Sequence, residues 1–189
     1  MRRRHFLAAT AGMSTLITGI TMSDEAAAQG DLDPQNTLYM DLKDGRVVIK
    51  LRPDLAPKHV ERVKELAKGG FYDNTPFHRV IDGFMAQGGD PTGTGTGGSK
   101  LPDLVAEFTN KAHFLRGTVG AARTGNPNSA NSQFYIMFAP APHLDGQYTI
   151  WGQVVQGMEL VDKIKKGPAN GTVSNPDRII KARLAADAG

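Results

Sequence analysis

Residues 77–90 read FHRVIDGFMAQGGD, and this stretch decides the fold. It contains two short β-like runs, Phe77–Ile81 and Phe84–Gln87, separated by the turn-forming dipeptide Asp82-Gly83. Two further blocks mix polar, small and aromatic residues in a way that packing alone does not explain. They are GAAR at 120–123 followed by NSQFYI at 131–136, and HLDGQYTIWG at 143–152.

Outside these blocks, short alternating runs bounded by Gly, Pro, Asn and Asp dominate the chain. Two stretches have helical spacing of their apolar residues, Ala56–Gly69 and Met158–Lys166. Eight short strands with two helices favour a mainly β fold, and we expect a closed eight-stranded antiparallel β-barrel with two capping helices rather than a sandwich. The other expected strands are Thr37–Lys43, Arg46–Arg52, Thr118–Ala122, Gln133–Phe138, Thr149–Val155 and Arg178–Leu184.

Composition excludes several classes of site. The chain has 189 residues, 40% of them hydrophobic, and no cysteine. This length fits one domain, and the lack of cysteine excludes disulfides, Cys-ligated metal sites and a thiol nucleophile. The histidines beyond residue 28 lie 19 to 35 positions apart without local pairing, so we expect no metal site.

The first 28 residues have the composition of an export signal peptide. Three arginines at 2–4 precede a segment of apolar and small residues at 6–22, and three alanines at 26–28 supply a cleavage pattern. Residues 3–7, RRHFL, resemble the twin-arginine export signal, with a general secretory signal as the alternative. Either route implies a periplasmic protein.

Beyond the export signal, residues 29–36 form a short polar tail. The 161 residues after position 28 carry 19 basic and 17 acidic side chains, and this near balance argues against a nucleic-acid partner. No run of about 18 consecutive apolar residues occurs, so we expect no membrane span once the leader is removed.

The glycine-rich segment GTGTGG at 93–98 satisfies the pattern G-x-G-x-x-G. Dinucleotide binding also needs a helix that opens directly after the glycines, and Pro102 blocks one here. We therefore interpret the segment as a flexible surface loop, and we expect no cofactor.

The three blocks together resemble the signature blocks of the cyclophilin family of peptidyl-prolyl cis-trans isomerases. They occur in the family's order and spacing, and the resemblance spans Leu38–Leu184. It implies an eight-stranded barrel with a helix over each end, in a domain at residues 37–187. The implied activity is non-covalent rotation of X–Pro bonds in proline-containing peptides and in unfolded or folding proteins. We expect a monomer, because nothing in the sequence suggests a larger assembly. The alternative is a cyclophilin-like module or chaperone that binds proline segments with little turnover.

The resemblance assigns catalytic roles to Arg79 and Gln87. Arg79 is expected to donate near the prolyl amide nitrogen, which gains lone-pair character as amide resonance is lost. Gln87 would hydrogen-bond the substrate backbone or orient Arg79. From the strand pattern alone, Arg79 would instead be a surface residue paired with Asp82 or Asp90.

Nine further residues are expected to contact the substrate. The resemblance implies an apolar pocket for the proline ring, whereas ordinary barrel core is the alternative for its apolar members. The backbone amides of 122–123 would hold the residue before proline, with the Arg123 side chain in solvent. Phe84 and Met85 can share one pocket only if the chain bends, and Gly83 offers a bend. The nine residues are Phe84, Met85, Ala122, Arg123, Gln133, Tyr135, His143, Leu144 and Tyr148.

Three of these positions depart from the best-known eukaryotic pattern. His143 stands where a tryptophan associated with cyclosporin binding usually lies, so we expect weak cyclosporin binding. Tyr148 stands where many members have a histidine, and Tyr135 replaces the usual pocket phenylalanine. Both tyrosines keep an aromatic wall and add a hydroxyl, which would narrow the choice of substrate.

Overall fold

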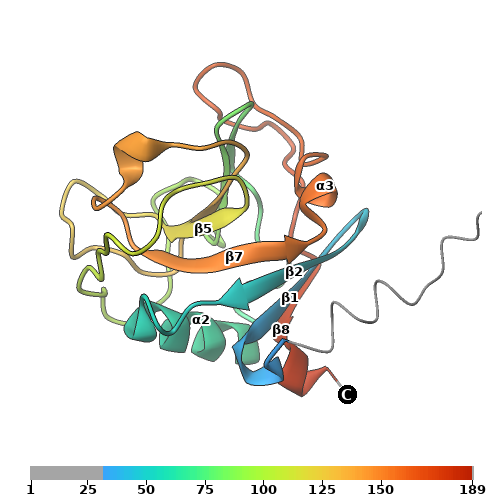
Figure 1. The fold of residues 1–189 in the computed structure, drawn as a ribbon. Helices are drawn as coiled ribbons and strands as arrows, with labels where there is room; N and C mark the ends of the chain where they lie inside the picture. The colour runs from blue at the N-terminus through green and yellow to red at the C-terminus, as the bar shows by residue number, and fades with distance from the viewer. Residues whose placement is uncertain (1–31, 189) are drawn as a thin grey trace, which may run out of the picture. The chain divides into compact units, whose positions relative to one another are not determined.

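The alternating runs of the sequence form eight strands that pair into one antiparallel sheet (Figure 1). The structure is a computed structural model that describes residues 32–188, so the expected export signal lies outside the described residues. All eight predicted strands are present, each within three residues of its predicted bounds. They are β1 Thr37–Leu42, β2 Gly45–Leu51, β3 Arg79–Ile81, β4 Met85–Gly88, β5 Thr118–Ala121, β6 Phe134–Met137, β7 Ile150–Gln156 and β8 Lys181–Leu184.

The sheet curls without closing, which corrects the predicted closed barrel. Its order is β3-β4-β6-β5-β7-β2-β1-β8, and the edge strands β3 and β8 do not pair with each other. Residues 167–180 lie along β3 instead; for example, the Val80 amide donates to the Gly171 carbonyl at 2.7 Å. Pro176 has no N–H, and Asn175 has a φ of 53°, so this segment forms no regular strand. The result is a half-barrel whose gap is filled by irregular chain.

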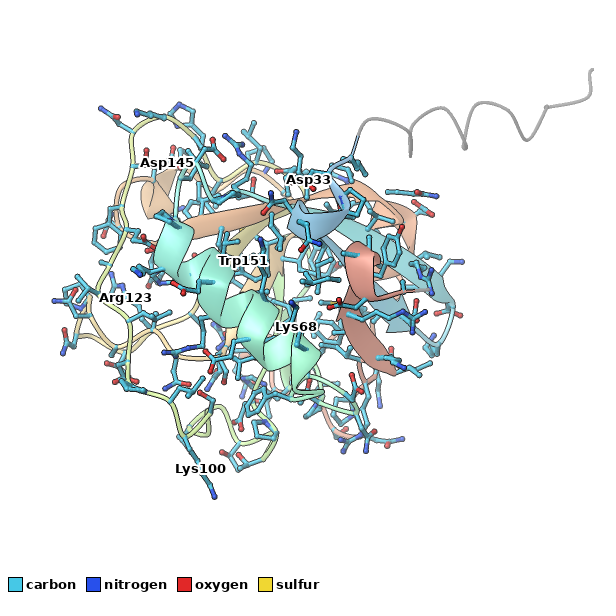
Figure 2. All side chains as sticks on the ribbon, turned by 90° about the horizontal axis from the view of Figure 1, so that it is seen from below. Asp33, Lys68, Lys100, Arg123, Asp145 and Trp151 are labelled. Carbon is cyan, nitrogen blue, oxygen red and sulfur yellow. The ribbon has the colours of Figure 1, made fainter. Side chains whose placement is uncertain are left out.

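The first predicted helix is confirmed as α2, Pro57–Lys68. Val60, Val63 and Leu66 form its buried stripe, and Pro57 begins it without losing a needed hydrogen bond. Figure 2, seen from below, shows this helix across one end of the half-barrel.

The second predicted helix is a single turn, α3 Met158–Val161. Beyond it the chain makes the tighter i to i+3 bonds, with the Ile164 amide donating to the Val161 carbonyl at 3.1 Å. Both residues are buried, and a separation of three matches the period of the 3-10 turn rather than that of a longer α-helix. Three 3-10 turns complete the described chain: η1 Pro34–Asn36 within the predicted tail, η2 Pro142–Leu144 and η3 Ala185–Asp187.

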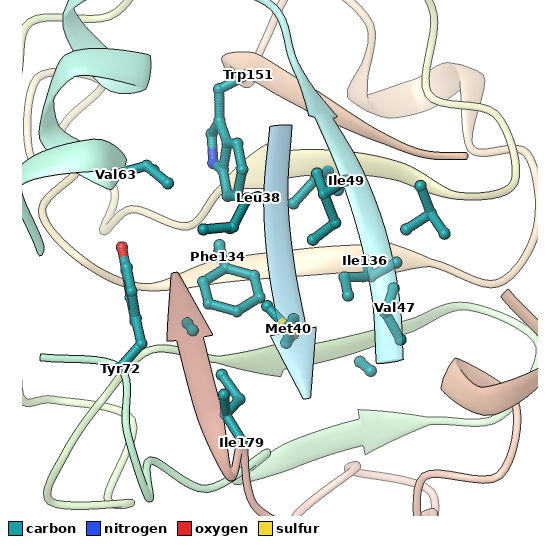
Figure 3. Close-up of a cluster of buried hydrophobic side chains, with 14 of the residues drawn as sticks. Leu38, Met40, Val47, Ile49, Val63, Tyr72, Phe134, Ile136, Trp151 and Ile179 are labelled. Carbon is teal, nitrogen blue, oxygen red and sulfur yellow. The ribbon is translucent and has the colours of Figure 1, made fainter. Parts of the chain in front are cut away.

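The interior of the half-barrel is packed around Phe134 (Figure 3). Its ring makes edge contacts with Tyr72 and Trp151, at centroid distances of 5.7 and 5.8 Å. Trp151 is buried at the core-strand position that its alternation predicts. A second apolar cluster, the outer cluster, lies on the opposite, outer face of the sheet and includes Met85 and Tyr135. Both faces of the sheet are therefore buried along β4 and β6.

The amino end of α2 is capped from a distant part of the chain. Its N-cap residue, Ala56, offers no side-chain acceptor. Glu107 supplies two instead, accepting the amide of Lys58 at 3.1 Å and that of His59 at 3.0 Å. The buried His59 ring also contacts the Glu107 carboxylate, at 2.6 Å through Nδ1. A carboxylate at this end satisfies unpaired amides and complements the helix dipole.

We predict that Glu107→Ala lowers the free energy of unfolding by about 1–3 kcal/mol, because it leaves these donors unpaired. Burial raises the pKa of Glu107, but the bonds from His59 and Lys58 outweigh this and hold the pKa below its ordinary value. Its stabilising contribution is therefore present above the ordinary pKa and is lost as the pH falls. Denaturant unfolding at pH 7 and at pH 4 measures both effects. Glu61→Gln, on the exposed face of α2, is the control, and an equal loss in both variants would contradict the prediction.

Candidate active site

Four strands each contribute one residue to a row on the outer face of the sheet. The register pairs Arg79 on β3 with Gln87 on β4, Gln87 with Tyr135 on β6, and Tyr135 with Gly120 on β5. Their chain neighbours, such as Val80, point to the interior core. The period of two along each strand thus places the two predicted catalytic residues side by side.

Hydrogen bonds connect this row to the glycine-rich loop. Arg79 Nη1 lies 3.5 Å from Gln87 Oε1, and Gln87 Nε2 donates to Gln133 Oε1 at 3.0 Å. Gln133 Nε2 in turn donates to the carbonyl oxygens of Gly95 and Gly97, at 3.0 and 2.9 Å. Both glutamine side chains are therefore oriented by the protein before any ligand arrives.

Arg79 has no carboxylate partner. Within residues 32–188, no salt bridge joins its guanidinium to an acidic side chain, so the pairing with Asp82 or Asp90 that the strand pattern favours is absent. The side chain is half-buried at the edge of an apolar cavity. Its charge and most of its donors are free to act on a ligand there.

The Asp90 side chain anchors the glycine-rich loop through hydrogen bonds. This fully buried carboxylate accepts the amide and hydroxyl of Thr92, at 2.8 and 2.7 Å, and the amides of Gly95 and Gly97, at 2.7 and 3.1 Å. Burial raises the pKa of Asp90, but these hydrogen bonds outweigh it and lower the pKa to about 2. The segment predicted as a flexible loop is thus tied to a buried charge, and its carbonyl groups hold Gln133.

Most of the predicted site residues surround one cavity of about 260 Å³. Its floor belongs to the second apolar cluster, on the outer face of the sheet, rather than to the interior of the half-barrel. Its lining consists of Arg79, Phe84, Met85, Gln87, Ala122, Arg123, Tyr135, Leu144 and Tyr148.

Phe84 and Met85 reach this cavity together because the chain turns before them. Gly83 has a φ of 68°, and the Phe84 amide closes the turn on the Ile81 carbonyl at 3.1 Å. The exposed His143 does not line the cavity, but its ring stacks on Phe84 at a centroid distance of 5.9 Å.

Tyr135 fits beneath the cavity because Gly120 faces it. A Cβ at Gly120 would lie 2.8 Å from the Tyr135 hydroxyl oxygen, so the tyrosine needs the glycine. The Tyr135 ring stacks on Phe114 at 5.8 Å and meets Tyr148 edge-on at 5.9 Å. Its hydroxyl is buried and has no hydrogen-bond partner within the described chain, and burial raises its pKa.

Arg123 borders the cavity and is less exposed than predicted. Its guanidinium stacks on Tyr148 at 4.4 Å and donates to the carbonyl oxygens of Gln147 and Thr124. In Figure 2 it lies at the rim of the molecule, away from Lys68. The Ala122 amide donates to the Gln133 carbonyl at 3.0 Å and is not free for a ligand.

A second cavity, of about 450 Å³, adjoins the first and shares Gln87, Ala122 and Arg123 with it. Gln133 lines the second cavity together with Ser129, Asn131 and part of the glycine-rich loop. Arg123 therefore borders both cavities.

Sequence reasoning missed the roles of Asp90, Gly120 and Gly171. Asp90 ends the signature stretch, so an acidic residue followed by a Thr- and Gly-rich segment was an available signal for a loop anchor. Gly120 and Gly171 act by close approach to Tyr135 and Arg79, and no local pattern reveals such contacts.

Between residues 32 and 188, no group of three or more His, Asp or Glu side chains lies close enough together to hold a metal ion. In the same range, no helix combines the length and apolar character needed to cross a membrane.

We predict that Asp90→Asn lowers the free energy of unfolding by about 2 kcal/mol, because an amide group cannot accept all the donors that the carboxylate accepts. Since the pKa of Asp90 is depressed to about 2, the wild-type contribution is present above pH 4 and is lost as the pH falls through 2. Denaturant unfolding at neutral pH is the measurement, with Asp44→Asn in an exposed turn as the control. A loss no larger than the control's would show that the loop does not depend on Asp90.

Known proteins resemble this chain in sequence and in fold. A probable peptidyl-prolyl cis-trans isomerase of Brucella suis is 54% identical over 95% of both chains, and the peptidyl-prolyl cis-trans isomerase-like 3 of Rattus norvegicus is 40% identical over 74% of this chain and 87% of its own. The crystal structure of a cyclophilin from Hirschia baltica superposes with a TM-score of 0.76 at 26% identity, covering 86% of this chain and 81% of that one.

A cyclophilin-type isomerase of Cryptosporidium parvum, solved in the presence of the dipeptide Ala-Pro, gives a TM-score of 0.72 at 28% identity, over 78% of this chain and 98% of its own. The family model described as cyclophilin type peptidyl-prolyl cis-trans isomerase matches residues 37–184, which include all eight strands and both cavities. The chain therefore belongs to the cyclophilin-type peptidyl-prolyl cis-trans isomerases.

Proposed function

We propose that the cavity of about 260 Å³ binds the proline ring of a substrate chain and that the site accelerates rotation of the X–Pro bond there. The observation that carries this proposal is the position of the unpaired Arg79 beside an apolar floor made by Phe84, Met85 and Tyr135. Transfer of the apolar proline ring from water to such a floor lowers the free energy, and a cation at the edge of the floor lies beside the amide.

The chemistry needs no covalent step. Rotation of the amide has a barrier of about 18–20 kcal/mol, because resonance between the nitrogen and the carbonyl must be broken. A turnover of about 1000 per second requires that the barrier fall by about 6 kcal/mol. As resonance is lost, the prolyl nitrogen gains a lone pair, and the Arg79 guanidinium donates to it. A preorganised donor of this kind contributes about 3–4 kcal/mol in other enzymes.

The neighbours of Arg79 hold it in place for this step. Gln87 limits its movement on one side. On another side lies Gly171, where a Cβ would meet Arg79 Cγ at 3.0 Å and Ile81 Cγ1 at 2.6 Å. Gly171 has a φ of 82° and accepts the Val80 amide, so the segment that fills the gap of the half-barrel also packs on the stem of the catalytic side chain. Gly171 is in this view a positioning residue.

The substrate backbone is held beside this cation. The Arg123 amide has no hydrogen-bond partner within residues 32–188, and Arg123 lines both cavities, so we assign its amide as the donor for the residue before proline. Residues further toward the amino end of the substrate would enter the second cavity, near Gln133. Binding without useful turnover is the alternative function, and the Arg79 experiment below distinguishes the two.

The place of action that we propose is the periplasm. The twin-arginine-like segment at residues 1–28 supports export, and the match to the Brucella suis protein, which extends over 95% of both chains, includes more than the isomerase domain. Fractionation of cells that express the full chain, with amino-terminal sequencing of the product, tests this. A periplasmic product that begins near residue 29 is expected, and an uncleaved cytoplasmic protein would contradict it.

We predict that Arg79→Ala lowers kcat/KM by at least tenfold for a short Ala-Pro peptide, while peptide binding changes less, because the donor acts mainly in the transition state. Protease-coupled cis/trans kinetics on residues 29–189 measures the rate, and circular dichroism verifies that the variant is folded. Arg52→Ala, paired with Asp54 away from the site, is the control. Unchanged turnover in Arg79→Ala would refute the mechanism, and an inactive wild type that binds the peptide would favour the binding module.

We predict that Gly171→Ala lowers kcat about tenfold with little change in KM, since the added methyl group displaces the Arg79 side chain and small misplacements are expensive for catalysis. Gly70→Ala is the matched control, because Gly70 also has a positive φ, of 68°, but a Cβ there meets nothing closer than 3.6 Å. Both variants carry backbone strain, so equal effects on kcat would assign the loss to strain alone. Thermal unfolding of both variants separates activity from stability.

A further inference from the structure

Two arginines without acidic partners line the cavity of about 260 Å³ that we assign to the proline ring, the proline cavity. Arg79 and Arg123 both line it, and Arg178, far along the chain, is the other arginine of residues 32–188 without a salt bridge. The remaining described arginines each have a carboxylate within salt-bridge distance; they are Arg46, Arg52, Arg62, Arg116 and Arg183.

Arg123 is held rigidly although no acid neutralises it. Its Nε and Nη2 donate to the Gln147 carbonyl at 3.2 and 2.8 Å, and its Nη1 donates to the Thr124 carbonyl at 2.8 Å. Tyr148 supports the plane of the guanidinium from one side. Three of the five N–H donors are thereby used, and two are left for a ligand. A side chain fixed in this way loses little further entropy when it binds a charged group.

The surroundings of Arg123 favour an anion. No acidic residue lines the proline cavity. The adjoining cavity contains one, Asp103, and its carboxylate already accepts a hydrogen bond from Asn131 Nδ2 at 3.0 Å. Two positive charges thus face a space with a single carboxylate, and their field extends over the position where the substrate chain passes from one cavity to the other.

We propose that this site selects substrates with an acidic residue, Glu or Asp, immediately before the proline. The inference rests on the proposed function, in which the Arg123 amide holds the residue before proline. The side chain of that residue then lies next to the Arg123 guanidinium, between the two cavities. A glutamate there pairs with the two free N–H donors, whereas a lysine meets a like charge.

The test compares three peptides that differ only before proline: Ala-Glu-Pro-Phe, Ala-Gln-Pro-Phe and Ala-Lys-Pro-Phe. Exchange between cis and trans is followed by NMR, so no protease influences the result. For residues 29–189 at low salt, kcat/KM is expected to be about threefold higher for Glu-Pro than for Gln-Pro, and lowest for Lys-Pro, as for a partly exposed ion pair. The preference is expected to shrink at about 0.5 M salt.

Variants assign the preference to one side chain. Arg123→Gln is expected to remove the Glu-Pro preference, and Arg123→Glu to reverse it in favour of Lys-Pro. Arg178→Gln changes the net charge equally but lines neither cavity, so its ratios are expected to match those of the wild type.

Equal rates for all three peptides in an active wild type would overturn this inference and leave the isomerase function intact. A preference that survives in Arg123→Gln would also overturn it. A wild type that accelerates none of the peptides would instead refute the proposed function itself.

Discussion

The alternation of side chains along β6 is the constraint on which the rest of the structure depends. Phe134 and Ile136 fill the half-barrel, while Tyr135 and Met137 between them form the outer cluster beneath the site. Because a shift of one residue would exchange these two sets, the register that packs the core also fixes the row from Arg79 to Gly120. Stability and the geometry of the site are therefore two consequences of the same pairing.

Several polar interactions in the described chain fix a buried or half-buried group, some through near neighbours in sequence and some through distant ones. Asp90 holds the nearby loop that in turn holds Gln133, and Glu107 accepts the Lys58 amide at the start of α2 from 49 positions away. Arg79 and Arg123 at the cavity have no counter-charge among the described residues. A glutamine side chain contacts the first and backbone carbonyls accept from the second, and neither partner cancels the positive charge. The positive charge of the site is thus kept while its parts are already ordered, as the proposed stabilisation of the twisted amide requires.

Much of the fold and of the site was predictable from the sequence. Strand positions follow from alternation with a period of two and from turn dipeptides such as Asp44-Gly45, and all eight were found. The resemblance of three blocks brought together residues that the structure does place around one cavity, with His143 and Gln133 beside it. The predicted closure of the barrel was wrong, because Asn175 and Pro176 prevent the segment that lies along β3 from forming a regular strand. The length of the second helix was also wrong, since Val161 and Ile164 fit a tighter turn.

By itself, the sequence determined the family and the positions of the strands along the chain, because these follow from local pattern and residue type. Only the tertiary structure decided which face of the sheet carries the site, that Arg79 and Arg123 have no acidic partner, and that Gly120 and Gly171 make room for Tyr135 and Arg79. The physical reason is that charge pairing and close packing depend on distances between residues that are remote in the chain, and the order of amino acids does not express those distances.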